Sequence, residues 1–245
     1  METKKEENKK DYTIVVIAIV VVIMIVWGVG VLLFNNGSKV GNANPAGENG
    51  QEQSETKKTE SQEADYTQWI SDTIEGNYYI PSLLFDTDDA RAINAEITKA
   101  VEGRPAESTE ENPYGIGYNA YYNKGILTLE MIVSDNSSHY YIYNVDTETG
   151  SRLSNSDLLA KLGLKEETVL EAVKSATSSL FKAQFSEEDT DEYKAALDAS
   201  VADINADTKM YVNENVKFVA VAKMHSPSTG EVVENLVVLE LDQLK

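Results

Sequence analysis

Two histidines and several clustered carboxylates are the side chains of this chain whose types and spacing could support chemistry. His139 follows Ser137 and Ser138, and His225 precedes Ser226. A serine nucleophile needs a histidine base placed in three dimensions, and neighbouring positions in the sequence do not supply that placement. The sequence also lacks the G-x-S-x-G turn that exposes a nucleophilic serine. We therefore expect no catalytic residues and no enzyme activity, although a carboxylate pair for glycoside cleavage stays open in so acidic a chain.

The carboxylate clusters have competing interpretations as calcium ligands and as helix or turn residues. Asp86, Asp88 and Asp89 lie together, but the order of residues that defines an EF-hand loop is absent. We interpret them as the start of a helix that Thr87 or Asp88 caps. The segment Asp146–Gly150 is interpreted as a turn in the same way. We expect no metal site and no cofactor.

Charge and cysteine content exclude further classes of function. The 245 residues carry 21 basic and 41 acidic side chains, a formal net charge of -20, and no cysteine. Nucleic acids are bound by clustered Lys and Arg, so a nucleic-acid partner is not expected. Without cysteine the chain has no disulfides, thiolate zinc sites or cysteine nucleophiles.

An apolar segment near the N-terminus predicts a membrane anchor. Thr13 to Phe34 contains no charged residue, and 22 helical residues cover about 33 Å, enough to span a bilayer. Lysines are concentrated before this span, so residues 1–12 are predicted to be a short cytoplasmic tail and all that follows to be extracellular. The alternative is a cleaved signal peptide, because Gly41 and Ala43 have the small side chains that a cleavage site requires.

The remainder divides into a linker and a folded domain. Residues 35–66 are rich in Asn, Gly, Glu, Ser and Gln and predict a disordered extracellular tether. Residues 67–245 carry 14 basic and 31 acidic side chains, a formal net charge of -17, and form the predicted extracellular domain.

The periodicity of the extracellular domain predicts an α+β fold. An apolar stripe at helical spacing predicts a helix from Thr87 to Glu102, and alternating apolar residues then predict three strands in a meander. Three further helices are expected, the first capped by Ser156, followed by a C-terminal hairpin and a last strand. We predict one antiparallel sheet, consisting of the meander and the C-terminal hairpin, with the helices on one face. The predicted strands are 114–122, 127–133, 139–145, 209–212, 216–224 and 235–241, and the later helices are 157–164, 165–185 and 189–204.

The meander strands are rich in tyrosine. Seven of the thirteen tyrosines lie between Tyr114 and Tyr143 and occupy both faces of the strands. The face opposite the core would carry Tyr121 and either Tyr140 or Tyr141, and we select Tyr121 and Tyr141 as candidate ligand-binding residues. The competing interpretation is that helices cover this face. Glu110 and Glu111, in an acidic loop, are candidate contacts for a cationic partner.

Several segments of the domain together resemble a known family. They are YYIPSL, the helix pattern A-x-x-I-N-x-E-I, YNAYYNKGILTLEM, YNVDTETG and L-x-x-x-D-L-L. This set resembles the outer domains of the anti-sigma-V, lysozyme-sensing membrane proteins and the accessory domains of related peptidoglycan deacetylases of Gram-positive bacteria. The resemblance implies a wall-facing α+β domain that binds a protein such as lysozyme. In that family a cytoplasmic segment of several helical turns binds a sigma factor, and residues 1–12 are too short for it, which puts a sigma-factor partner in doubt.

The sequence thus predicts a single-pass membrane protein with an acidic extracellular domain that binds a basic wall-associated protein. The alternative is a peptidoglycan-acting enzyme or the accessory domain of one.

Overall fold

The computed structural model describes residues 66–245 apart from 77, 107, 110–112 and 186–188. The contacts within the chain separate Met1–Glu60 from Ser61–Lys245, and the described residues all belong to the second unit. The predicted tail, the span Thr13–Phe34 and almost all of the tether therefore lie outside the described residues. None of the helices in the described ranges is both long and apolar enough to cross a membrane.

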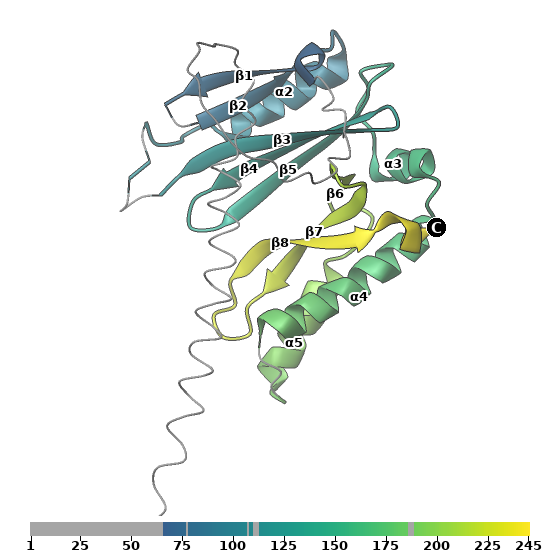
Figure 1. Cartoon of the computed structure of the whole chain (residues 1–245). Helices are drawn as coiled ribbons and strands as arrows, with labels where there is room; N and C mark the ends of the chain where they lie inside the picture. The colour runs from purple at the N-terminus through teal and green to yellow at the C-terminus, as the bar shows by residue number, and fades with distance from the viewer. Residues whose placement is uncertain (1–65, 77, 107, 110–112, 186–188) are drawn as a thin grey trace, which may run out of the picture. The chain divides into compact units, whose positions relative to one another are not determined.

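Three antiparallel sheets and four α-helices make up the described domain, which confirms the α+β class (Figure 1). The sheets have the strand orders β1-β2, β3-β4-β5 and β6-β7-β8. The strands are β1 (Ile70–Glu75), β2 (Tyr78–Leu83), β3 (Gly115–Asn123), β4 (Ile126–Ser134), β5 (Ser138–Asp146), β6 (Met210–Val212), β7 (Lys217–His225) and β8 (Val232–Glu240). The helices are α2 (Asp88–Ala100), α3 (Asn155–Leu162), α4 (Glu166–Gln184) and α5 (Asp191–Ala202), with short 3-10 turns η1 (Tyr66–Gln68) and η2 (Leu241–Leu244).

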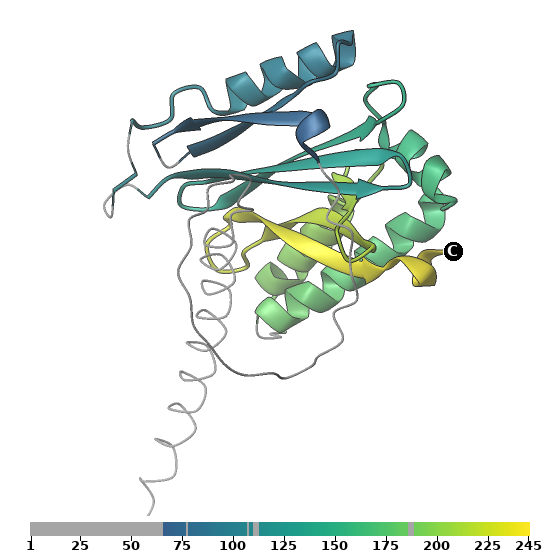
Figure 2. The same ribbon diagram turned by 45° about the horizontal axis from the view of Figure 1, so that its top comes forward.

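The prediction of a single sheet with helices on one face is wrong. The meander β3-β4-β5 and the C-terminal strands β6-β7-β8 are separate sheets that oppose each other, and each has its own helical layer (Figure 2). Helix α2 covers one face of the meander and the hairpin β1-β2 lies beside β3, whereas α4 and α5 cover the far face of the C-terminal sheet. The reason is that both sheets have two largely buried faces, so each needs a partner layer on either side.

Apolar residues of α2 and β4 form the core on the α2 side of the meander. Ala90, Ile93 and Ile97 recur at helical spacing and are buried against the alternating residues Leu127 to Val133 of β4. Thr87 caps α2 by accepting a hydrogen bond from the Ala90 N–H, which confirms the predicted cap. The hairpin β1-β2 completes this core, and its first strand was not predicted because ISDTIE has little apolar alternation.

A second core is built from α3, α4 and the helix-facing side of the C-terminal sheet. Val169 and Val173 of α4 pack with Phe218, Ala220 and Ala222 of β7. Helix α3 begins two residues earlier than predicted. Ser154, not Ser156, is its N-cap, because Ser154 and Asp157 form a reciprocal capping box at the required spacing.

Gly150 lies in the turn between β5 and α3, and this turn contacts the start of α2. Its φ is +68°, a left-handed conformation, and a Cβ placed there would lie 2.9 Å from the Phe85 Cβ and from the Thr87 Cγ2. The Gly150 carbonyl also accepts a hydrogen bond of 2.8 Å from the Thr87 hydroxyl. A side chain at this position would therefore displace the residue that caps α2.

We predict that Gly150→Ala lowers the free energy of unfolding by about 2 to 4 kcal/mol, because left-handed strain and overpacking add. The matched control is Gly163→Ala at the end of α3, where φ is +72° but a Cβ meets no atom within 4 Å. That variant should lose only about 1 to 2 kcal/mol of strain energy. Chemical unfolding followed by circular dichroism measures both, and equal losses would contradict the close approach at Gly150.

Candidate functional site

The most unusual polar group of the described domain is a buried carboxylate between the two sheets. Glu130 lies on β4, the central strand of the meander, and is 2% exposed. Its side chain points away from α2 and toward the C-terminal sheet, because it alternates with the core residues Leu129 and Met131. A charge at this depth is stable only if donors surround it.

Three side chains donate hydrogen bonds to Glu130. Asn119 Nδ2 lies 2.9 Å and the Tyr121 hydroxyl 2.8 Å from Oε2, and the Tyr211 hydroxyl lies 2.5 Å from Oε1. Asn119 and Tyr121 belong to β3, whereas Tyr211 comes from β6 in the opposing sheet. We call these four residues the inter-sheet cluster. It is a hydrogen-bonded connection between the two halves of the domain.

Burial and charge keep both tyrosines in the neutral, donating form. Burial first, and then the negative charge of Glu130, raise the pKa of Tyr121 and of Tyr211 far above the usual tyrosine range. The two rings are also stacked, with centroids 5.7 Å apart and planes 11° from parallel. The donors and the acceptor are engaged with one another, so this arrangement positions the sheets and holds a defined polar network.

A second group of contacts joins the edge of β5 to the C-terminal sheet. The Tyr140 N–H donates to Glu234 Oε2 at 2.7 Å, and Lys209 Nζ donates to the Tyr140 carbonyl at 2.5 Å and to Glu234 Oε1 at 2.7 Å. Asn144 lies four residues after Tyr140 on β5, and its side-chain Nδ2 donates a hydrogen bond of 2.8 Å to the Met210 carbonyl. Together these contacts cover part of the outer edge of β5, where backbone groups would otherwise lack partners.

The two tyrosines predicted as site residues, Tyr121 and Tyr141, lie on opposite faces of the meander. Tyr121 lies in the inter-sheet cluster, half-buried beneath the C-terminal sheet, so strands and not helices cover this face. The register shows that Tyr140 and not Tyr141 shares that face, because Tyr140 pairs with Ile132 and Tyr141 with Met131. The selection of Tyr141 for the same face was wrong. Its ring packs on the α2 side, with Lys209 Nζ 5.7 Å from its centroid.

The described carboxylates that were considered as metal ligands pair with basic side chains or accept backbone hydrogen bonds. Asp86 and Asp88 pair with Arg91 at the start of α2, and Asp89 accepts a hydrogen bond from the Arg152 N–H. Asp146 accepts from the Glu148 and Thr149 N–H groups and pairs with Lys161, as expected for a turn. Across the described residues, no group of three or more His, Asp or Glu side chains has metal-binding geometry. Glu110 and Glu111 lie outside the described residues.

Neither histidine has the geometry of a catalytic base in a triad. His139 Nε2 lies 3.2 Å from the Ser137 hydroxyl and 3.7 Å from Asp135 Oδ1, so one ring nitrogen faces both groups. In a triad the carboxylate contacts the other ring nitrogen. His225 Nε2 pairs with Asp203 at 2.9 Å, and the hydroxyl of Ser200 accepts from the His225 backbone N–H.

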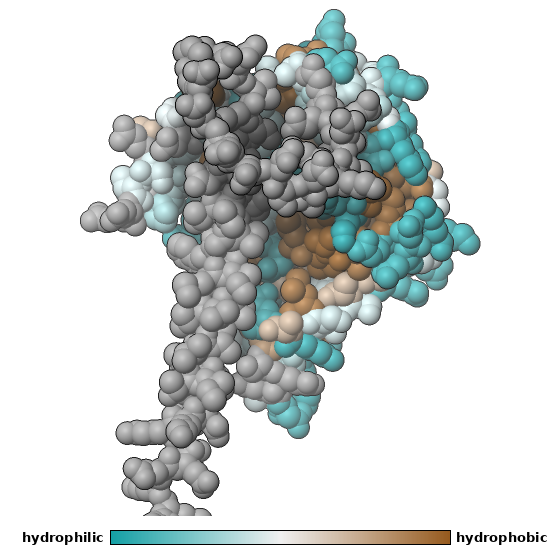
Figure 3. Space-filling view, in the orientation of Figure 1, coloured by the Kyte–Doolittle hydropathy of each residue, from teal (hydrophilic) through white to brown (hydrophobic). Residues whose placement is uncertain are grey.

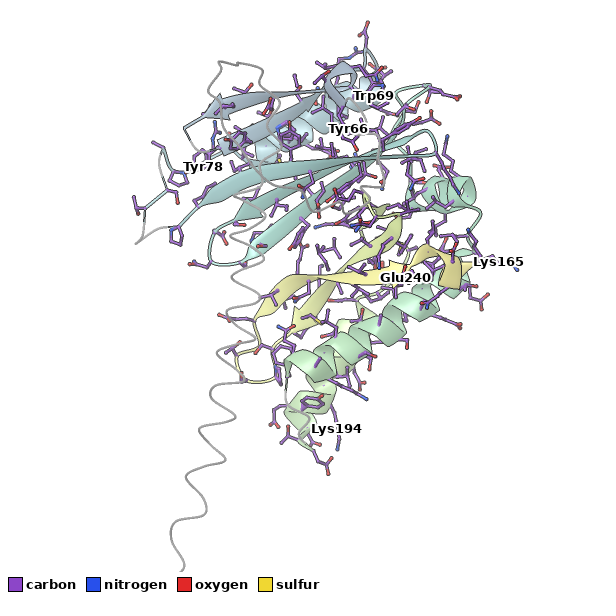
Figure 4. The ribbon with its side chains drawn as sticks, viewed as in Figure 1. Tyr66, Trp69, Tyr78, Lys165, Lys194 and Glu240 are labelled. Atoms are coloured by element: carbon purple, nitrogen blue, oxygen red, sulfur yellow. The ribbon has the colours of Figure 1, made fainter. Side chains whose placement is uncertain are left out.

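Partly buried aromatic residues and exposed valines lie at two other places. Trp69 and Tyr66 lie at one end of the β1-β2 hairpin (Figure 4), where the Trp69 ring stacks on Tyr122 with centroids 5.1 Å apart. The second place is β8, where Val232 and Val238 are exposed. The space-filling view shows apolar surface in the middle of the domain, in the region where Figure 1 labels β8 (Figure 3).

Sequence reasoning missed Glu130 and Tyr211. Glu130 is the one charged residue of the β4 segment ILTLEMIVS, and a carboxylate inside such a strand signals a buried polar contact. Its partner Tyr211 lies 81 positions away, and no local pattern links the two.

We predict that Tyr211→Phe lowers the free energy of unfolding by about 1.5 to 3 kcal/mol, because it removes a hydrogen bond to a buried charge. The control Tyr122→Phe removes a hydroxyl from an exposed ring, and we expect a change of about 0.5 kcal/mol or less. Denaturant unfolding measures both. Similar values for the two variants would show that the bond to Glu130 adds no stability.

We also predict that stability falls at alkaline pH. Burial raises the pKa of Tyr118 and of Tyr143 to about 12, and the pKa of Tyr121 and Tyr211 is raised as well. Tyrosine in the unfolded chain ionises near about pH 10, so this stabilisation is complete below that pH and is lost as the pH rises through about 12. Tyrosinate absorbance of these rings should appear together with loss of circular dichroism. Ionisation of all tyrosines near about pH 10 in a folded protein would refute this.

Comparison with known proteins assigns no function to these residues. No protein-family model matches the chain, and no curated protein matches its sequence. The functional argument therefore depends on the charges and contacts described above.

Proposed function

We propose that this protein is a single-pass membrane protein whose acidic extracellular domain binds a basic wall-associated protein, such as a lysozyme-like hydrolase. The observation that carries the proposal is the charge of the folded domain. Residues 67–245 hold 31 acidic and 14 basic side chains. A surplus of this size produces a negative potential that attracts cationic proteins.

The ion pairs of the domain support this reading, because they use up much of its positive charge. Within the described residues, eight of the fourteen basic side chains pair with a carboxylate, and most of the other described carboxylates are exposed, with Glu130 as a buried exception. The paired residues are Arg91, Arg104, Arg152, Lys161, Lys194, Lys209, Lys217 and Lys245. A cationic partner would therefore meet little local repulsion.

The mutual bonding of the inter-sheet cluster also fits a binding module better than the enzyme alternative. The inter-sheet cluster holds the sheets in one arrangement, and its carboxylate and hydroxyls are already bonded to each other. In the alternative, a peptidoglycan-acting enzyme or its accessory domain, a carboxylate must reach the glycan. The proposal includes a membrane anchor at Thr13–Phe34 and a wall-facing orientation. It also draws on the resemblance to lysozyme-sensing proteins.

We predict that intact protoplasts carrying the full chain capture fluorescent lysozyme, and that external protease removes this binding. Association should slow as salt rises from low to physiological strength, because screening then acts over about 8 Å. An acidic protein of similar size is the control and should not bind. Lack of lysozyme capture at low salt, or capture insensitive to external protease, would refute the proposal. Release of wall fragments by the purified chain would favour the enzyme alternative.

A further inference from the structure

Strand β8 forms the outer edge of the C-terminal sheet, next to β7. Hydrogen bonds from the Val221 N–H to the Lys209 carbonyl and from the Asn213 N–H to the Lys217 carbonyl show that odd-numbered residues of β7 face β6. Even-numbered residues of β7 therefore bond to β8, and the Ser226 N–H to Glu231 carbonyl bond continues that ladder. In the register of β7 and β8, these partners are the odd-numbered residues of β8.

It follows that the even-numbered residues of β8 direct their backbone N–H and C=O groups away from the sheet. No backbone hydrogen bond to these groups is found in the part of the chain that the structure describes. They are Val232, Glu234, Leu236 and Val238, with Glu240 at the end of the strand. A row of such groups is a template for an additional strand.

The side chains of β8 leave this edge accessible. Val232 is 46% and Val238 is 51% exposed, and the segment contains no proline, lysine or arginine. Proline, lysine and bulges are the usual means by which proteins prevent strands from adding to an edge. Strand β5 contacts β8 at Glu234, which accepts a hydrogen bond from the Tyr140 N–H, whereas the Val238 side chain is exposed.

The net charge of the domain indicates what kind of strand fits. Glu234 and Glu240 of β8 are each paired with a lysine, so the attraction for a cationic segment comes from the acidic surplus of the whole domain. Figure 4 shows Glu240 near the C-terminal end of β8. A second copy of this domain would bring another net charge of -17 against the same edge. A segment that carries Lys or Arg instead gains from the negative potential.

We propose that β8 accepts, as an added strand, an extended segment of a protein partner in which apolar side chains alternate with Lys or Arg. The apolar side chains of that segment lie beside Val232 and Val238, and its backbone pairs with the even-numbered residues of β8. This inference rests on the proposed function and names the contact that the basic partner makes.

The test uses the full chain in nanodiscs and a synthetic peptide of nine residues, the length of β8, in which lysine alternates with valine. Hydrogen exchange should show slow exchange for the odd-numbered amides of β8 with and without peptide. The amides of Val232, Glu234, Leu236 and Val238 should become slow only in the complex. A peptide of equal charge, N-methylated on the backbone nitrogens that would pair, should bind at least about tenfold more weakly.

Two variants that add the same charge distinguish an effect at the β8 edge from an effect of the overall electrostatic field on peptide binding. Val238→Lys places a lysine on the edge and should weaken peptide binding about tenfold. Ile74→Lys, at a 62% exposed position on β1, should change it about twofold or less. Circular dichroism confirms that both variants are folded.

Three results would overturn strand addition: equal binding of the N-methylated peptide, equal effects of the two variants, or concentration-dependent protection of the even-numbered amides without peptide, which would mean self-association. If lysozyme still binds in a salt-dependent way in any of these cases, the proposed function stands and only the strand contact fails. Binding of the lysine-valine peptide without binding of any basic protein would refute the proposed function instead.

Discussion

The arrangement of the whole domain depends on how one buried carboxylate is satisfied. Glu130 is 2% exposed on the central strand of the meander, and its three donors come from two separate sheets. Because a hydrogen bond to a buried charge contributes about 1.5 to 3 kcal/mol, the packing in which Tyr211 reaches Glu130 is favoured over others. Apolar packing alone would tolerate small shifts between the sheets, whereas this network defines one relative position.

The relative position of the two sheets determines which surfaces of the domain are accessible to a partner. Because the C-terminal sheet covers the Tyr121 face of the meander, the aromatic residues there are structural contacts, and the outer edge of the C-terminal sheet remains available. The ion pair of Lys209 and Glu234 at the Tyr140 backbone protects part of the edge of β5. Strand β8 has no comparable protection near Val238. The domain thus combines one edge that its own side chains cover with another that stays exposed.

Charge acts at a longer range than these contacts. The acidic surplus of the domain attracts cationic partners from a distance, but it cannot select among them, since screening limits it to about 8 Å at physiological ionic strength. Selection requires short-range features such as backbone pairing and apolar contact. The proposed strand addition at β8 would supply both, and the rigid inter-sheet cluster would keep the edge preformed.

The local elements of the domain could be predicted from the sequence, because each depends on neighbouring residues. The stripe of Ala90, Ile93 and Ile97 with the Thr87 cap predicts α2, and the alternation in the meander predicts its three strands in the observed order. The cap of α3 was misplaced because two serines compete and only the spacing to Asp157 decides between them. The pairing of layers was not predictable: Tyr211 lies 81 residues from Glu130, and the periodicity of a strand shows that two faces are buried but not what buries each. For the same reason only the tertiary structure decided that Tyr140 faces the C-terminal sheet while Tyr141 does not, and that β8 is left with an open edge.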